Sequence, residues 1–159
     1  MDDYATVFTR HQARLMRVAE LIAGDRDVAA DAVAEAFART YPHWRRGRVE
    51  DVGAYLRRAV LNEIQRTWRK RHVSLDEARY VDGAVEGIVE RDRVWRALDT
   101  LSSRQRAAIV LRYYEDLSEA DIAHAMGIPP GTVKSNLSRA LDKLRPALAD
   151  ERNTGVEHG

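Results

Sequence analysis

The chain has 159 residues, of which 45% are hydrophobic and 32% are charged, so its size and composition are typical of a globular protein with one domain or two small ones. The absence of cysteine excludes disulfides and thiolate metal sites. The formal net charge of +1 excludes a uniformly basic nucleic-acid binder. No apolar run reaches about 18 residues and the N-terminal residues lack a secretory pattern, so we expect a cytoplasmic protein without a membrane span.

Apolar residues recur with a helical period along almost the whole chain, and no alternating stretch persists, so we predict an all-α protein. The first helix is predicted over residues 3–23. Asp25 or Asp27 can cap a second helix, because a side-chain carboxylate accepts hydrogen bonds from the first backbone N–H groups. We expect this helix to reach Thr40 and to stop before Pro42, since proline interrupts the helical hydrogen-bond ladder.

A long third helix, capped by Asp51, is predicted to reach His72. Its apolar stripe consists of Tyr55, Leu56, Ala59, Val60, Ile64 and Trp68. We expect Trp68, and Trp44 before it, to lie in the core rather than to stack on a ligand. Residues 45–71 hold nine lysines and arginines against three acidic residues. Such a charge run is usually a solvated helix face, and it also suits a nucleic-acid backbone.

The helical pattern lapses over residues 73–87, where glycines and acidic side chains indicate a flexible linker. It resumes near Ile88 and continues to Leu148. We therefore predict two small helical modules, 1–72 and 88–148, joined by this linker. The remaining residues, 149–159, show no apolar pattern and are predicted to be a disordered tail.

Local signals divide the second module into shorter helices. Ser102 with Gln105 has the spacing of a capping box, and Ser118 is placed to begin the next helix. Gly127 suits the left-handed position that ends a helix, and Pro130 suits the first turn of the last one.

The segment over 118–141 has the order of a helix-turn-helix: a short helix, a glycine turn and a second helix. We expect Ile122, Ala123 and Met126 to pack on Val133 and Leu137. The polar residues left facing outward are Thr132, Lys134, Ser135, Asn136, Ser138 and Arg139. Arginine can bond guanine and asparagine can bond adenine, while lysine and hydroxyl groups hold phosphates. The pattern favours duplex DNA binding over the alternative of a plain helical hairpin with a polar outer face.

The second module resembles region 4 of bacterial sigma factors of the extracytoplasmic-function (ECF) group, through LSSRQRAAIVLRYYEDLSEADIAHAMGIPPGTVKSNLSRALDKLR. The first module is similar to region 2 of that group, through GDRDVAADAVAEAFARTYPHW and the following AYLRRAVLNEIQRTWRKRH. The resemblance covers about residues 4–146, and the order and spacing of the modules agree with the family. It points to an ECF sigma factor of actinobacterial type.

The resemblance implies one role for each module. Module 1–72 would be a sigma region 2 helical bundle that binds core RNA polymerase and that recognises and melts the −10 promoter element. Module 88–148 would be a sigma region 4 helix-turn-helix bundle that recognises the −35 element through the polar face of its last helix. The same module would dock on the flap of the polymerase β subunit, with 112–116 as the candidate region.

The family's functional positions can be carried over to individual residues. Those implied to contact the β′ clamp helices of polymerase are Asp31, Ala34, Glu35 and Phe37. Those implied to act on the −10 region are Arg45, Arg46, Arg57, Arg58, Asn62 and Arg66. Asn62 falls on the asparagine that this family uses near a flipped base, and Phe37 is expected to belong mostly to the core.

The resemblance implies core polymerase, promoter DNA and an anti-sigma protein as partners. We expect no cofactor, no metal site and no catalytic residue, because the five histidines are scattered and no nucleophile–base pairing is visible. A stand-alone helix-turn-helix regulator is the first alternative, but 1–72 shows neither a glycine-rich phosphate loop nor a βα pattern. A small helical nucleic-acid enzyme or an interaction adaptor is the second alternative. An enzyme should show a constellation of site residues, which the sequence lacks, and an adaptor would leave the basic segment 45–71 and the polar stripe 134–139 without a role.

Overall fold

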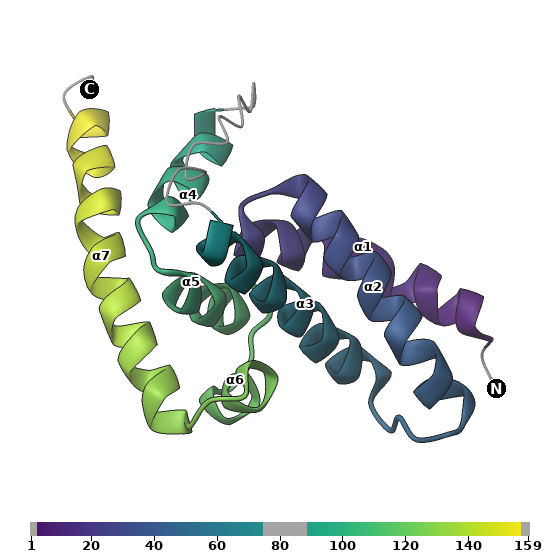
Figure 1. Cartoon of the computed structure of the whole chain (residues 1–159). Helices are drawn as coiled ribbons and strands as arrows, with labels where there is room; N and C mark the ends of the chain where they lie inside the picture. Colours follow the sequence, from purple (N-terminus) through teal and green to yellow (C-terminus); the bar gives the residue numbers. More distant parts are fainter. Residues whose placement is uncertain (1–2, 75–88, 157–159) are drawn as a thin grey trace. The chain divides into compact units, whose positions relative to one another are not determined.

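The computed structural model describes residues 3–74 and 89–156, and all secondary structure in these two ranges is helical (Figure 1). The predicted all-α class is therefore confirmed. The chain divides into two compact units, Met1–Ala84 and Val85–Gly159, which are described separately below. Most of the predicted linker, residues 75–87, lies outside the described residues. Among the helices that the structure describes, none is long and apolar enough to cross a membrane.

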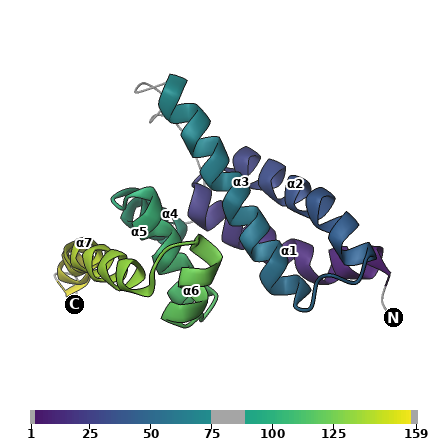
Figure 2. The ribbon, with the colours of Figure 1, turned by 60° about the horizontal axis from the view of Figure 1, so that its bottom comes forward.

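Over residues 3–74, the first unit is a bundle of three helices. They are α1 (Tyr4–Ala23), α2 (Arg26–Arg45) and α3 (Val52–Ser74), and each packs on the other two (Figure 2). The Asp3 carboxylate caps α1 by accepting a hydrogen bond of 2.8 Å from the Thr6 backbone N–H, and bonds from Thr6 lower the pKa of Asp3. Gly24, at a φ of 71°, ends α1 as predicted.

The carboxylates at the starts of α2 and α3 both act as caps. Of the two candidates for α2, the cap is Asp25, whose side chain accepts hydrogen bonds from the backbone N–H groups of Asp27 and Val28. The predicted cap of α3 is confirmed, because the Asp51 carboxylate accepts a bond of 3.1 Å from the Ala54 N–H. A local carboxylate–amide contact thus fixes where each of these helices begins.

The core of the first unit forms where α3 packs against α2 and α1. Leu56, Val60 and Ile64 of the predicted stripe are at most 1% exposed. The helix α2, which packs on α3, buries small side chains such as Ala29 and Ala36, both of which are fully buried. Small residues let the helix backbones approach closely, so long aliphatic side chains can fill the space at native density.

The second helix does not stop before Pro42, as the sequence predicted, but continues to Arg45. Proline has no N–H, so Pro42 cannot donate the helical hydrogen bond to the carbonyl of residue 38. The cost of this lost bond is small because Ala38 is exposed to water. The last turn is held instead by packing, because the rings of Tyr41 and Trp44 lie 5.0 and 5.1 Å from that of Tyr4. Tertiary contacts thus outweigh the local stop signal.

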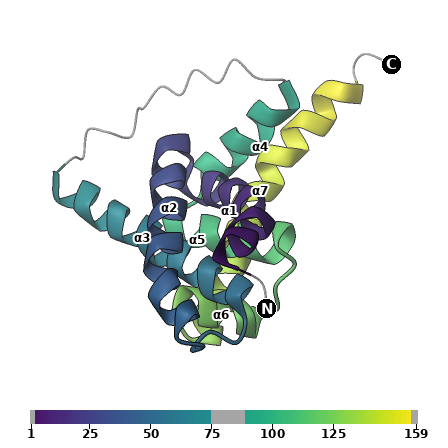
Figure 3. The ribbon, with the colours of Figure 1, turned by 90° about the vertical axis from the view of Figure 1, so that its right-hand side faces the viewer.

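Over residues 89–156, the second unit consists of four α-helices and one π-helical turn. They are α4 (Val89–Asp99), α5 (Ser103–Ile109), the turn η1 (Val110–Tyr114), α6 (Glu119–Met126) and α7 (Pro130–Val156). The longest of them, α7, packs against α4, α5 and α6 (Figure 3). The predicted capping box is present: the Ser102 hydroxyl accepts from the Gln105 N–H, and the Gln105 side chain accepts from the Ser102 N–H.

The π-helical turn was not predicted. It follows α5 without a break, and the backbone N–H of Glu115 donates to the carbonyl of Val110, five residues back. Asp116 then takes a left-handed φ of 55°, and the Arg112 guanidinium donates to the Leu117 carbonyl over 2.9 Å. These contacts close the end of the turn and set the direction in which the chain enters α6.

The last helix is longer than predicted. The sequence predicted its end at Leu148 and a disordered tail over 149–159, but α7 extends to Val156. The prediction followed the loss of the apolar pattern, which marks the end of a buried face rather than the end of helical backbone. Good helix formers such as Ala149 and Glu151 continue the helix, and no glycine occurs between Leu148 and Gly155. The final three residues lie outside the described part of the chain.

Candidate functional site

The helix-turn-helix of the second unit is built as predicted. The Ser118 hydroxyl caps α6 by accepting from the Asp121 N–H over 3.1 Å, and Gly127 ends α6 at a φ of 67°. Pro130 is the first residue of α7. Ile122 and Val133 are fully buried, and the other residues expected between the two helices are also buried. This packing fixes which side of α7 faces outward.

The six polar residues predicted on α7 lie on its outward side. Lys134, Ser135, Ser138 and Arg139 are exposed, and Thr132 and Asn136 are half-buried. The Asn136 amide donates 3.0 Å to the Thr132 carbonyl one turn back, which uses one of its two amide hydrogens. The face therefore offers two full positive charges, hydroxyl groups and an amide with one hydrogen still available, within the first turns of one helix.

The residues predicted for the −10 region fall into three places in the first unit. Arg58, Asn62 and Arg66 are all exposed and follow each other at intervals of four, so they form one row along α3. Arg45 and Arg46 are exposed at the end of α2, before the turn at Gly47. Arg57 is half-buried and lies off the row. The structure thus brings three of the six predicted residues together.

The predicted polymerase-binding residues divide between surface and core. Asp31, Ala34 and Glu35 are exposed on α2, with the two carboxylates one turn apart. Phe37 is only 5% exposed, and its ring lies 4.8 Å from that of Phe8. As expected, Phe37 is a core residue, and it supports this surface from below rather than forming part of it.

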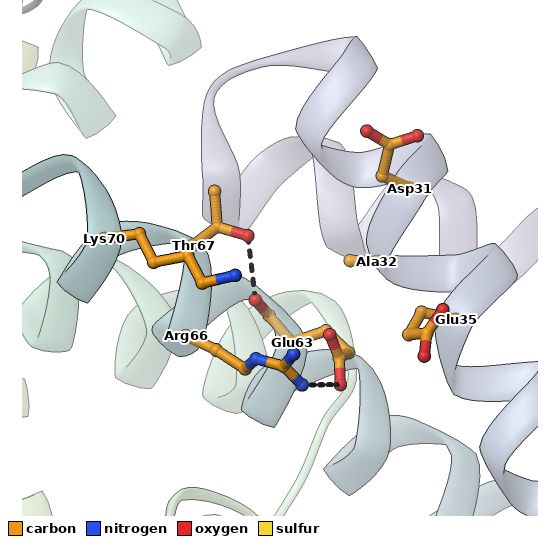
Figure 4. A pocket seen from close by; sticks show the side chains of 7 residues that line it. All are labelled: Asp31, Ala32, Glu35, Glu63, Arg66, Thr67 and Lys70. Carbon is orange, nitrogen blue, oxygen red and sulfur yellow. Dashed lines mark hydrogen bonds and ion pairs between the residues drawn. The ribbon is translucent and has the colours of Figure 1, made fainter.

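A polar hollow of about 270 Å³ lies between α2 and α3 (Figure 4). Its lining residues are Asp31, Ala32, Glu35, Glu63, Arg66, Thr67 and Lys70. Figure 4 shows the acidic side chains of α2 on one side of the hollow and the side chains of α3 on the other. The hollow therefore joins two predicted sets, since Asp31 and Glu35 were assigned to polymerase and Arg66 to DNA.

Neither Glu63, which lines this hollow, nor Arg39, which pairs with two of its lining residues, was predicted as a site residue. The Nε atom of Arg39 lies 2.9 Å from Oε1 of Glu35 and 3.1 Å from Oε1 of Glu63. Glu63 Oε1 also lies 3.7 Å from an Nη atom of Arg66. The four-residue spacing of Glu35 and Arg39 could have indicated the first pair. The pair between Arg39 and Glu63 joins two helices, and no local spacing indicates it.

The first unit also exposes aromatic side chains that were not predicted as a site. Phe8 and Tyr41 are each about 40% exposed, and the imidazole of His43 lies 5.9 Å from the Tyr55 ring. Trp44 and Trp68 are half-buried, so each has one side in the core and one at the surface. Within the described residues, no cluster of three or more histidine, aspartate or glutamate side chains could hold a metal ion.

Comparisons with known proteins agree with this architecture. Residues 7–73 match the family model described as Sigma-70 region 2, and residues 91–144 match that described as Sigma-70, region 4. The chain is 38% identical to the RNA polymerase sigma-E factor of Streptomyces coelicolor, over 89% of this chain and 83% of that protein. It is 32% identical to the ECF RNA polymerase sigma factor SigM of Mycobacterium tuberculosis, over 98% and 82%.

A solved structure is similar along nearly the whole chain. It is the sigma factor RpoE of Bartonella quintana, crystallised with the anti-sigma factor NepR. The TM-score is 0.75 at 25% sequence identity, and the match covers 94% of this chain and 98% of that one. Because both region models match in order and relatives above 30% identity span most of the sequence, the chain belongs to the sigma-70 family of bacterial sigma factors, in its ECF group.

Proposed function

We propose that this chain is the promoter-specificity subunit of a bacterial RNA polymerase: it directs the core enzyme to particular promoters and starts transcription there. The observation that carries the proposal is that each of two compact units matches one sigma region and presents its own polar, cationic row. These rows lie on α3 and on α7. The chain itself performs no covalent chemistry in this proposal, and it acts in the cytoplasm, where polymerase works.

The second unit positions the complex on duplex DNA at the −35 element. The first turns of α7 enter the major groove, where the Arg139 guanidinium and the Asn136 amide can bond base edges. Lys134 and the hydroxyl groups of Ser135 and Ser138 hold the phosphates on either side and fix the register of the helix. This assignment is supported by exposure: Asn136 is half-buried, and the other four side chains are exposed.

The first unit holds the −10 element in its melted form. Pulling bases from the stack costs free energy. This cost is offset when cationic side chains bind the backbone of the separated strand and a pocket accepts a base. The row of Arg58, Asn62 and Arg66 supplies two guanidinium groups around one amide, and Arg45 and Arg46 add charge at the end of α2. Arg57 flanks the row from a half-buried position.

Core polymerase holds both units at the spacing of the promoter elements. Asp31 and Glu35 present two carboxylates to the β′ clamp helices, with the small Ala34 between them. The segment Arg112–Asp116, at the end of the π-helical turn, is the proposed contact for the β flap. An anti-sigma protein would silence the chain by covering these same surfaces. The net charge of +1 supports a dependence on polymerase, since few phosphates can be neutralised by the chain alone.

The proposal is tested by run-off transcription from a promoter library, with core polymerase from a Streptomyces species in the presence and absence of the chain. We expect sequence-specific starts only when the chain is added. Arg139→Ala should reduce starts at −35-dependent promoters about fivefold or more, since losing one base contact costs about 1–3 kcal/mol. Arg145→Ala is the matched control, because Arg145 is exposed on the same helix but outside the proposed face.

Two outcomes would contradict the proposal. A chain that neither co-elutes with core polymerase nor directs starts is not a sigma factor. If that chain also binds specific duplex DNA by itself at moderate salt, it acts as a stand-alone helix-turn-helix regulator, which is the alternative that the sequence left open.

A further inference from the structure

The side chain of Arg39 lies against the proposed polymerase-binding surface. Its Nε atom donates a hydrogen bond of 2.9 Å to Oε1 of Glu35, one turn back on α2. Glu35 is one of the two carboxylates that the proposed function assigns to the β′ clamp helices. A carboxylate that is already paired with a cation attracts a partner's cation less strongly. In the free chain, the charge of Glu35 is therefore partly masked.

Arg39 also forms an ion pair with a second carboxylate, in a more sheltered position. Its Nε atom lies 3.1 Å from Oε1 of Glu63 on α3. The Glu63 side chain is 15% exposed, whereas that of Glu35 is 49% exposed. Attraction between charges is screened less where water is partly excluded, so the pair with Glu63 is the more persistent of the two.

The hollow between α2 and α3 leaves room for Glu35 to exchange partners. Asp31, Glu35 and Glu63 all line it, and Figure 4 shows Asp31 and Glu35 on the α2 side with Glu63 across from them. A cationic side chain from a partner could therefore reach both carboxylates of α2 from outside. Arg39 would meanwhile keep its contact with Glu63 and would not be left without an acceptor.

We propose that Arg39 is a positioning residue that masks Glu35 in the free chain, and that Glu63 retains Arg39 when Glu35 turns to a cationic side chain of core polymerase. The inference rests on the proposed function and adds a regulatory contact to that surface. Exposed ion pairs are weak, so the exchange is easily reversed and changes affinity by only a few fold. We therefore expect some variants to bind core polymerase more tightly and others more weakly, and none to lose binding.

The test measures the affinity of the labelled full chain for core polymerase from a Streptomyces species at low and at moderate salt. Arg39→Gln unmasks Glu35 and should tighten binding about two- to fivefold at low salt, with a smaller gain at moderate salt. Glu63→Gln removes the second carboxylate, so Arg39 pairs more fully with Glu35. This variant should therefore bind core polymerase more weakly, by a similar factor. The double variant should behave like Arg39→Gln, because the proposed effect of Glu63 on Glu35 passes through Arg39, whereas its pair with Arg66 does not involve Glu35.

Matched controls remove the same charges elsewhere in the first unit. Arg26 is on the same helix as Arg39 and forms an ion pair of 3.8 Å with Glu20. Arg26→Gln removes the cation of this pair, and Glu20→Gln removes the carboxylate. Both should leave the affinity unchanged. Arg39→Lys keeps the charge and should stay within about twofold of the wild type, which provides a second variant if Arg39→Gln disturbs folding. Thermal unfolding, followed by circular dichroism, checks that each variant is folded.

The outcomes separate this inference from the function on which it rests. The masking role is overturned if Arg39→Gln binds core polymerase as tightly as the wild type or more weakly. It is also overturned if Glu63→Gln weakens binding by the same factor in the wild type and in the Arg39→Gln variant. If Glu35→Gln leaves the affinity unchanged while the wild type still directs transcription, the sigma function stands and the masking role is wrong. If the wild type does not bind core polymerase, the proposed function itself fails.

Discussion

Arg106 shows how the second unit accommodates a charge in its core. Its side chain is buried, with an Nη atom 2.8 Å from the Asp99 carboxylate and the guanidinium 5.5 Å from the centre of the Trp95 ring. Burial lowers the pKa of Arg106, and the hydrogen bond and charge of Asp99 oppose that shift. The carboxylate is itself mostly exposed, so water still solvates it. The long stem of Arg106 then acts largely as an apolar core side chain.

This interpretation predicts different costs for two substitutions of Arg106. Arg106→Ala removes the stem and leaves a cavity, which should lower the free energy of unfolding by about 2–4 kcal/mol. Arg106→Met keeps most of the volume, and the carboxylate of Asp99 is solvated when it loses the ion pair, so the substitution should cost about 1 kcal/mol or less. Urea unfolding followed by circular dichroism measures both. Equal costs for the two variants would mean that the ion pair and ring contact dominate.

The turn between α6 and α7 sets the orientation of the proposed recognition helix. Gly127 takes a φ of +67°, which side chains with a Cβ atom adopt only with strain, yet a Cβ placed there would meet no atom within 4 Å. The requirement for glycine at this position is therefore one of backbone conformation and not of space. Gly131, in the first turn of α7, also has open space around it but no positive φ.

Alanine substitution of the two glycines should accordingly have opposite effects. Gly127→Ala should lower the free energy of unfolding by about 1–2 kcal/mol through backbone strain alone. Gly131→Ala should leave stability unchanged or raise it by up to about 1 kcal/mol, since alanine is the better helix former. Thermal unfolding of the full chain compares them. A loss of stability from Gly131→Ala as large as that from Gly127→Ala would contradict this account of the turn.

The elements that could be predicted from sequence are those fixed by nearby residues. Capping at Ser102 and Ser118 and the left-handed Gly127 involve contacts within five residues, so their spacing alone indicated them. The passage of α2 through Pro42 depends on the packing of Tyr41 against Tyr4, which lies 37 positions earlier in the chain. The π-helical turn was missed because no glycine or proline marks it in the sequence.

The candidate sites follow the same division. The polar face of α7 was predicted because helical spacing places its six residues on one side once the apolar positions are known. The burial of Phe37 was also expected. The contact of Arg39 with Glu63 joins residues 24 positions apart on two helices, so it depends on how α2 and α3 pack. Charge pairs between helices have no periodic signature in sequence.

At the scale of the whole molecule, each unit has its own buried core. Ile64 lies in the first core and Ile122 in the second, and both are fully buried. The main pairings of α1, α2 and α3 are with each other, and those of α4, α5, η1, α6 and α7 are likewise within the second unit. A domain with its own core can in principle fold alone. We therefore infer that the two units unfold independently.

Matched substitutions in the two cores test this independence. Ile64→Val and Ile122→Val each remove one buried methylene, which should cost about 0.5–1.5 kcal/mol without preventing folding. Amide hydrogen exchange followed by mass spectrometry should show faster exchange in α1–α3 for the first variant and in α4–α7 for the second. Faster exchange in both units after either substitution would mean that they unfold as one. Independent unfolding would leave polymerase free to set the spacing of the two units on DNA, because no shared core would resist that placement.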